Sequence, residues 1–311
     1  MRMRITVEPQ RGASYERILG LARAAETCGF DGFFRSDHYL RNQGEGPVGP
    51  GPTDAWMTLA GLARETRRIR LGTLVSPVTF RYPGPIAIAI AQVDAMSGGR
   101  LELGLGTGWF EAEHRSLGIP FPPFPERTER LLDLLELLDL WWTTPSDESF
   151  DYKGRHIQLI DCLGLPKPAQ PRVPIILGSN GPKVGPRLVA GRADEFNRPF
   201  GTAQDCAEQF ARVRTSCDER GVRHPERWST VVTLCCGSTW AEAVRRSANA
   251  GWEPSRMSAL PGRVIGTPEQ VVDELSQYAA MGVDTVYLQI LDMDDYDHLD
   301  LIAREVAPKL T

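Results

Sequence analysis

The chain has 311 residues, a formal net charge of −5 at pH 7 and a hydrophobic fraction of 41%, values typical of a soluble globular enzyme with a sizeable core. The negative balance argues against a dedicated nucleic-acid surface, which would need clustered lysine and arginine. No apolar stretch approaches the length of a membrane span, and the N-terminus lacks the apolar segment of a signal peptide. We therefore expect a cytoplasmic protein with neither a nucleic-acid nor a membrane partner.

Short β-rich runs alternate with amphipathic helical segments along the whole chain. The predicted strands cover residues 4–9, 31–36, 69–76, 100–108, 173–179, 193–197, 228–238 and 283–292. The predicted helices cover residues 15–29, 54–66, 85–99, 127–142, 182–192, 202–221, 239–251 and 267–282. Repeated βα units imply parallel strands, and eight of them imply closure. The sequence thus predicts a single domain over residues 1–311, a (β/α)8 TIM barrel with insertions at the C-terminal face of the strands.

A doubly wound open sheet is the alternative architecture. The glycine-rich strand end that could carry a dinucleotide is Gly104-Leu-Gly106-Thr-Gly108-Trp109. The dinucleotide fingerprint requires glycine where Trp109 stands, and it belongs on the first βα turn of its unit. Spacing and position therefore both favour the barrel.

Two insertions and the cysteines complete the organisation. Residues 41–53 are rich in glycine and proline and predict a loop over the barrel mouth. Residues 150–161 alternate around Lys153-Gly154 and predict a β-hairpin. The six cysteines form no CxxC pair and no zinc-like grouping with histidine, so we read them as small core residues in a reducing compartment and predict no metal site.

In such barrels, polar residues at the carboxyl ends of the strands line the active site. The aromatic run of the second strand ends in Asp37 and His38, which places an acid and an imidazole at the mouth. A histidine there is suited to proton transfer near neutral pH. The alternative is a loop histidine that simply hydrogen-bonds Asp37.

Other strand ends carry small and polar residues, each of which has both a functional and a purely structural interpretation. A run of small residues at a strand-to-helix turn lets backbone N–H groups approach an anion, although an ordinary tight turn looks the same. Trp109 is suited either to stacking on a ring or to filling a gap. We expect Glu111, Glu113 and His114 to begin a short helix, with two of the three on the solvated surface. The candidates at these ends are Thr73, Leu74, Thr107, Gly108, Trp109, Gly178, Ser179, Asn180 and Gly181.

Several blocks, in order, resemble the luciferase-like oxidoreductase superfamily, and specifically its branch that uses the deazaflavin coenzyme F420. They are GFDGFFRSDHY, RIRLGTLVSPVTFRYP, AMSGGRLELGLGTGWFEAEHRSLGIPFP, ERTERLLDLLELLDLWW, FDYKGRHIQL and PIILGSNGPKVGPRLVAGRADEFN. The resemblance covers the chain from the first strand to about Asn197, and more loosely beyond it. It implies a (β/α)8 barrel, usually a homodimer, with a flavin-type ring at the carboxyl ends of the strands.

The resemblance also implies roles for the candidate residues. His38, beside Asp37, would lie near the ring and relay a proton. Thr73-Leu74 matches the place of a non-prolyl cis peptide behind the ring. The segment 107–109 would flank the polar side of the cofactor, and the segment 178–181 would hold its phosphate through backbone amides.

We therefore expect an oxidoreductase that transfers a hydride between C5 of coenzyme F420 and a small organic substrate. One alternative is an FMN-dependent monooxygenase that uses reduced flavin and O2, and another is a cofactor-binding homologue without catalysis. Family members that act on glucose 6-phosphate carry an acidic residue directly after Gly-Thr-Gly, where this chain has Trp109. A sugar-phosphate substrate is therefore not expected.

Overall fold

The structure, a computed structural model, describes residues 1–41 and 51–310. Its strands are β1 (Arg2–Val7), β2 (Gly32–Arg35), β3 (Arg70–Thr73), β4 (Ser76–Pro77), β5 (Leu101–Gly106), β6 (Phe150–Lys153), β7 (Gln158–Cys162), β8 (Ile175–Gly178), β9 (Glu195–Pro199), β10 (Arg227–Cys236), β11 (Arg263–Gly266) and β12 (Thr285–Gln289). Its α-helices are α1 (Tyr15–Thr27), α2 (Ala55–Glu65), α3 (Pro83–Ser97), α4 (Glu111–Ser116), α5 (Phe124–Thr143), α6 (Val184–Val189), α7 (Ala203–Arg220), α8 (Trp240–Asn249), α9 (Pro254–Ala259), α10 (Pro268–Ala280) and α11 (Tyr296–Glu305).

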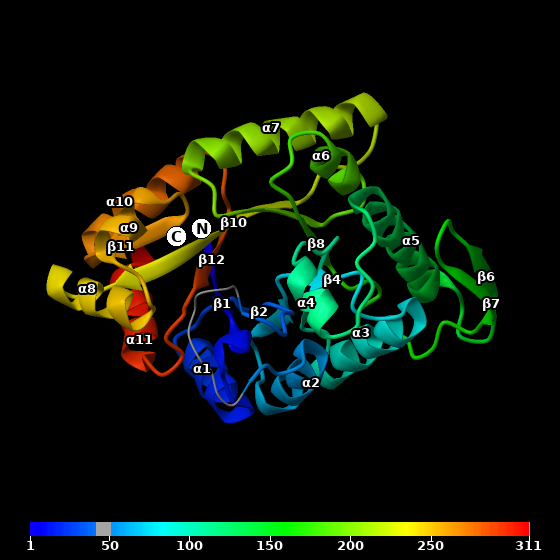
Figure 1. The fold of residues 1–311 in the computed structure, drawn as a ribbon, viewed down its shortest axis with the longest axis horizontal. Coiled ribbons are helices and arrows are strands. Elements are labelled where there is room, and N and C mark those ends of the chain that lie inside the picture. The colour runs from blue at the N-terminus through cyan, green and yellow to red at the C-terminus, as the bar shows by residue number, and fades with distance from the viewer. Residues whose placement is uncertain (42–50, 311) are drawn as a thin grey trace.

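Parallel strands form a closed barrel in the order β1-β2-β3-β5-β8-β9-β10-β12, with helices around it (Figure 1). The parallel pairs β9–β10 and β12–β1 complete the ring. The predicted (β/α)8 barrel is confirmed, because each of the eight predicted strands overlaps one barrel strand.

The structure differs from the predicted elements mainly where the chain bends or segments are short. The predicted strand 69–76 is divided into β3 and β4, and the sixth strand, β9, runs two residues further than predicted. We did not predict β11, α9 or α11. In α11 only His298, Leu299 and Ile302 are buried, and such a narrow apolar face is hard to distinguish from a polar loop.

Local signals explain where several helices begin. Asp54 is the N-cap of α2 and accepts hydrogen bonds from the amides of Trp56 and Met57. Thr202 and Asp205 form a capping box at the start of α7. These caps place helix starts at the ends of loops that leave the barrel mouth.

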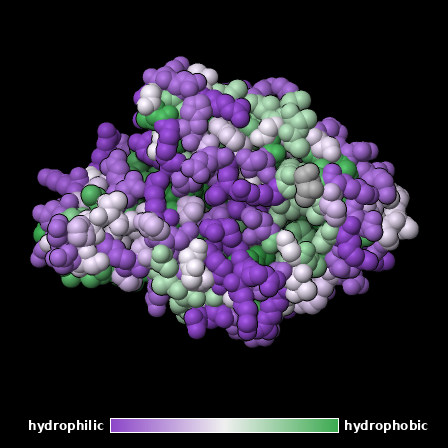
Figure 2. Space-filling view, turned by 180° about the vertical axis from the view of Figure 1, so that it is seen from behind, coloured by the Kyte–Doolittle hydropathy of each residue, from purple (hydrophilic) through white to green (hydrophobic). Residues whose placement is uncertain are grey.

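The predicted hairpin is present as the antiparallel pair β6–β7. It packs against α5, where the Asp133 carboxylate accepts hydrogen bonds from the amides of Arg155, His156 and Ile157. The other predicted insertion, the loop 41–53, lies largely outside the described residues. Hydrophilic residues dominate the face seen in Figure 2, and none of the helices within residues 1–41 and 51–310 has the length and apolar character needed to cross a membrane.

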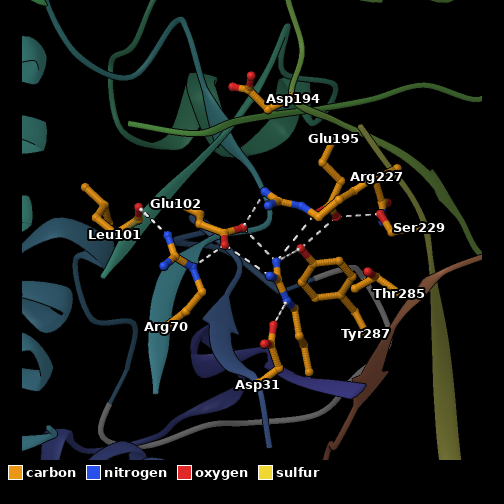
Figure 3. Close-up of polar contacts among 12 residues, drawn as sticks. Asp31, Arg70, Leu101, Glu102, Asp194, Glu195, Arg227, Ser229, Thr285 and Tyr287 are labelled. Carbon is orange, nitrogen blue, oxygen red and sulfur yellow. Dashed lines mark hydrogen bonds and ion pairs between the residues drawn. The ribbon is translucent and has the colours of Figure 1, made fainter. Parts of the chain in front are cut away.

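The base of the barrel interior, at the amino ends of the strands, holds a buried charged cluster (Figure 3). Arg4 donates hydrogen bonds to both oxygens of Glu102, at 2.7 and 3.0 Å, and to Asp31 at 2.7 Å. Glu102 also pairs with Arg70 and Arg227, and Arg227 reaches Glu195 at 3.0 Å. Three arginines thus balance three carboxylates, and buried charges in a low-dielectric interior require such pairing.

An apolar layer covers this cluster and separates it from the barrel mouth. Phe34, Ile176, Val231 and Tyr287 form a buried cluster inside the ring, with Leu74 and Phe200 packed against it. Phe34 meets Tyr287 edge to face at 5.0 Å between ring centroids. Above this layer, the barrel opens into a cavity at its mouth.

Candidate active site

A cavity of about 580 Å³ lies at the mouth of the barrel, within the size range of small-molecule sites. Residues from the ends of β1, β3, β5, β8, β9, β10 and β12 line it, as the barrel rule predicts. The predicted site residues on its walls are Leu74, Thr107, Trp109, Gly178, Ser179, Asn180 and Gly181. The predicted residues Asp37, His38, Thr73 and Gly108 lie behind this lining layer.

The wall contributed by the third strand contains a non-prolyl cis peptide between Leu74 and Val75. We expected it at Thr73-Leu74, so the predicted position was wrong by one residue. Thr73 is fully buried, and its hydroxyl donates a hydrogen bond to the carbonyl of Gly104 at 2.8 Å. Thr73 therefore joins β3 to β5 behind the wall, while Leu74 and Val75 face the cavity.

The turn after β5 presents an aromatic surface. Gly108 has φ 77°, a conformation that favours glycine, and a Cβ there would lie 3.2 Å from the Thr79 hydroxyl. Trp109 follows it, 62% exposed and stacked on Phe110 with ring centroids 5.0 Å apart. Trp109 also meets the His38 ring edge to face at 5.7 Å. An indole so exposed on a cavity wall offers a flat surface for a planar ligand.

His38 is paired with a carboxylate that the sequence did not reveal as its partner. Its Nδ1 lies 2.9 Å from Oε2 of Glu113, which comes from α4. The other oxygen of Glu113 accepts hydrogen bonds from the amides of Tyr39 and Leu40. The carboxylate therefore fixes both the ring and the backbone that follows it. Nε2 has no hydrogen-bond partner within the described part of the chain, and it is the nitrogen left for proton exchange.

The charges of this pair stabilise each other. Burial of His38 acts to lower its pKa, but the hydrogen bond and the charge of Glu113 outweigh burial, so the pKa is raised from 6.5. Burial of Glu113 acts to raise its pKa, and the hydrogen bond from His38 with those of the two amides brings it below the usual value. The pair therefore favours an imidazolium facing a carboxylate.

Asp37 is part of a different group of charges. Its carboxylate accepts a hydrogen bond from Ser76 at 2.7 Å and pairs with both terminal nitrogens of Arg81. Arg81 also bonds Asp54 at 2.6 Å, so it ties the end of β2 to the N-cap of α2. Asp37 is only 1% exposed. Neither Asp37 nor Arg81 lines the cavity, and these contacts position the backbone of His38.

The short helix α4 is confirmed, but its exposure was predicted wrongly. Glu113 and His114 are buried and only Glu111 is exposed, whereas we expected two of the three on the solvated surface. His114 bonds the carbonyl of Phe110 through Nδ1 at 2.8 Å and the Thr79 hydroxyl through Nε2 at 2.7 Å. Both of its ring nitrogens are thus occupied, in contrast to Nε2 of His38.

The loop after β8 forms a cradle of backbone amides. Between residues 178 and 185, the N–H groups of Asn180, Lys183, Val184 and Gly185 donate no hydrogen bond to any described residue. The carbonyl of Gly181 is held at 2.8 Å by the side chain of Gln209 on α7. Successive unpaired N–H groups of this kind are suited to an anion such as a phosphate. The cavity and its cradle thus fit a planar ring that carries a phosphate.

Gly185 offers a test of this cradle. A Cβ at this position would lie 2.1 Å from the Ser179 hydroxyl, so Gly185→Ala forces the loop to shift. We expect the affinity for FMN or coenzyme F420 to fall by about tenfold or more, equivalent to ~1.4 kcal/mol. Gly84→Ala is the control, because a Cβ there meets nothing within 4 Å. Equal affinities of the two variants in a fluorescence titration would contradict the assignment.

The rim opposite the cradle is polar and internally bonded. Gln289 donates a hydrogen bond to Glu8 at 2.9 Å and accepts one from Thr233 at 2.6 Å. Ser36 bonds Gln10, which in turn bonds Glu8. Glu8 is therefore held in place on the cavity wall by neighbouring side chains, as a fixed acceptor facing any substrate.

A model of the luciferase-like monooxygenase family matches residues 1–285. The chain is 36% identical over 320 aligned positions to an F420-dependent glucose-6-phosphate dehydrogenase of Nakamurella multipartita, covering 94% of this chain and 92% of that enzyme. An enzyme of the same description from Amycolatopsis mediterranei is 37% identical over 179 positions, which are 57% of this chain but only 51% of the relative.

Solved structures share the fold at low sequence identity. An F420-dependent secondary alcohol dehydrogenase in complex with an F420–acetone adduct superposes with a TM-score of 0.83 at 17% identity, over 100% of this chain and 99% of that one. The oxygenating constituent of 3,6-diketocamphane monooxygenase from Pseudomonas putida, in complex with FMN, superposes with a TM-score of 0.76 at 19% identity, over 99% and 98%. The family match covers the barrel as far as the first residue of β12, and the chain therefore belongs to the luciferase-like monooxygenase family.

Proposed function

We propose that the protein is a coenzyme F420-dependent oxidoreductase that acts on a small organic substrate at the barrel mouth. The observation that carries the proposal is the cavity lined by an amide cradle and the exposed indole of Trp109, with the ring of His38, paired to Glu113, 5.7 Å from that indole. The family membership supports it, and so do the two relatives named for F420-dependent dehydrogenation.

In this proposal the residues bind, orient and exchange protons, while a bound deazaflavin supplies hydride transfer at its C5. The amides of the segment 178–185 hold the phosphate. Leu74, Val75 and Trp109 hold the ring and exclude water from it. Nε2 of His38 gives a proton to the substrate during reduction or takes one during oxidation, and Glu113 stabilises the protonated ring.

Glucose 6-phosphate is not the substrate that we propose, although two relatives are named for it. Directly after Gly-Thr-Gly this chain presents the exposed indole of Trp109, which supplies an apolar surface and no acid. Glu113, which follows Trp109 in the chain, pairs with His38. Its two carboxylate oxygens are occupied by the His38 ring and by two backbone amides. An uncharged substrate with an apolar part suits this wall better.

The rival function is an FMN-dependent monooxygenase, since the cradle also suits the phosphate of FMN and a neighbour of the same fold binds it. Fluorescence titration of the purified protein with coenzyme F420 and FMN in parallel separates the two. Selective binding of F420 is the expected result, and selective binding of FMN would favour the monooxygenase. Tight F420 binding without turnover of a broad set of alcohols, aldehydes and ketones would indicate a non-catalytic homologue.

From the family resemblance we also propose a cytoplasmic homodimer. Analytical ultracentrifugation of the purified protein tests whether it is a dimer.

Glu113→Gln tests the source of the raised His38 pKa. The imidazolium is present below the folded-state pKa and is lost as the pH rises through it. Removal of the Glu113 charge lowers that pKa, so we expect the alkaline limb of activity in the reducing direction to move to lower pH. Glu111→Gln, an exposed neighbour on the same helix, is the matched control. Superimposable pH profiles for the two variants would show that Glu113 does not tune His38.

A further inference from the structure

The groove between α6 and α7 carries an excess of positive charge. This hollow of about 410 Å³ is lined by three cationic residues, Lys183, Arg187 and Arg212, and by one carboxylate, Glu219. Figure 1 shows α6 lying beneath α7, on the outside of the barrel. The whole chain has a net charge of −5, so the charge of the groove is opposite in sign to the net charge of the chain.

The cations of the groove are poorly neutralised. Within residues 1–41 and 51–310, neither Lys183 nor Arg187 has a carboxylate within ion-pair distance. Arg212 pairs with Glu208 at 3.3 Å, but both side chains are almost half exposed, and such pairs are weak. Arg220 adds another guanidinium, which bonds the carbonyl of Arg187 at 2.8 Å. Like charges that are only weakly neutralised repel one another, and an anionic ligand would relieve that repulsion.

The groove adjoins the candidate active site. Pro182 and Lys183 line both the cavity at the barrel mouth and this groove. They belong to the loop whose amides form the phosphate cradle, so the groove lies beside the cradle. A chain attached to a phosphate in the cradle would leave the barrel along Arg187 and Arg212.

We propose that this groove binds the acidic tail of coenzyme F420, with Arg187 and Arg212 as the residues that recognise its carboxylates. The inference rests on the proposed function and adds to it the means by which the protein selects a deazaflavin over FMN. FMN ends at its phosphate and therefore does not reach the groove. The contact is electrostatic and partly exposed, so it weakens as salt screens it.

The test compares Arg187→Glu/Arg212→Gln with Arg64→Glu/Arg67→Gln, which makes the same change in charge at exposed arginines around the end of α2, far from the groove. Fluorescence titrations use coenzyme F420 fractions that differ in the number of tail carboxylates, with FMN in parallel, at low and high salt. We expect the groove variant to bind F420 about tenfold more weakly at low salt, a change equivalent to ~1.4 kcal/mol. Its affinity should no longer depend on tail length, while its affinity for FMN and its circular dichroism match the control.

Other outcomes overturn the inference in distinguishable ways. If the groove variant keeps the wild-type affinity for F420 and its dependence on tail length, the tail runs elsewhere and the proposed function is untouched. An equal loss for F420 and FMN would mean that these arginines act on the cradle itself. If the wild-type protein binds no F420, the proposed function fails and the inference fails with it.

Discussion

Replacement of His38 by glutamine is expected to lower kcat by about 10²–10⁴-fold, the usual contribution of a positioned proton-transfer group. The amide keeps a polar group against Glu113 but cannot exchange a proton through Nε2. The cavity walls do not include His38, so the affinity for the coenzyme should change by less than about threefold, well below one tenfold step of ~1.4 kcal/mol. Coenzyme-linked turnover of a substrate found by screening, together with a binding titration, checks both parts.

The matched control is His224→Gln. His224 is also paired with a carboxylate, Asp218, at 2.8 Å, but it is exposed and remote from the mouth. We expect this variant to retain wild-type turnover. If His38→Gln retained more than about a tenth of the wild-type kcat, its loss would lie below the range for proton-transfer groups and the assignment would be wrong.

Arg4→Met is expected to destabilise the protein strongly. The substitution leaves Glu102 and Glu195 buried with only Arg70 and Arg227 as cationic partners, and both carboxylates are fully buried. Removal of one partner from a buried ionic group costs about 3–5 kcal/mol, because the remaining charges stay desolvated. A lower midpoint of urea unfolding is the measurement.

Arg2→Met on the same strand is the control. Arg2 is exposed and forms no ion pair within the described residues, so its replacement should change the free energy of unfolding by no more than about 0.5 kcal/mol. Equal midpoints for the two variants would mean that the charged cluster contributes little to stability. The double variant Arg4→Met/Glu102→Gln should recover part of the loss, because removal of one carboxylate restores the balance of positive and negative charges in the cluster.

The barrel could be predicted from the sequence because buried parallel strands leave a strong local signal. Segments such as 100–108 are short apolar runs next to longer amphipathic helices, and this alternation permits few architectures. Segments whose structure depends on tertiary contacts were missed. β11 pairs only with the last part of β10, and a four-residue strand at the end of a longer one has no periodicity of its own.

The site could be predicted in part for the same reason. The predicted ends of the strands placed Leu74, Trp109 and Gly178 at the mouth of the barrel, and all three line the cavity. This was possible because the carboxyl ends of all barrel strands meet at the same face. The partner of His38 could not be predicted, because Glu113 is 75 residues away in the chain. Sequence spacing does not show which side chain of so short a helix points inward. An acidic residue soon after a strand end at the mouth was the available signal, and we read it as surface.

The apolar layer of Phe34, Ile176 and Val231 has a further consequence. It lies between the charged base around Arg4 and the His38–Glu113 pair at the mouth, and no direct hydrogen bond or ion pair joins that cluster to this pair in the described part of the chain. Effects of substitutions without shared partners generally add. Substitutions that alter substrate preference at the mouth can therefore accumulate, while substitutions at the base restore the stability that is lost. In evolution or in the laboratory, the two ends of this barrel can be changed as separate modules.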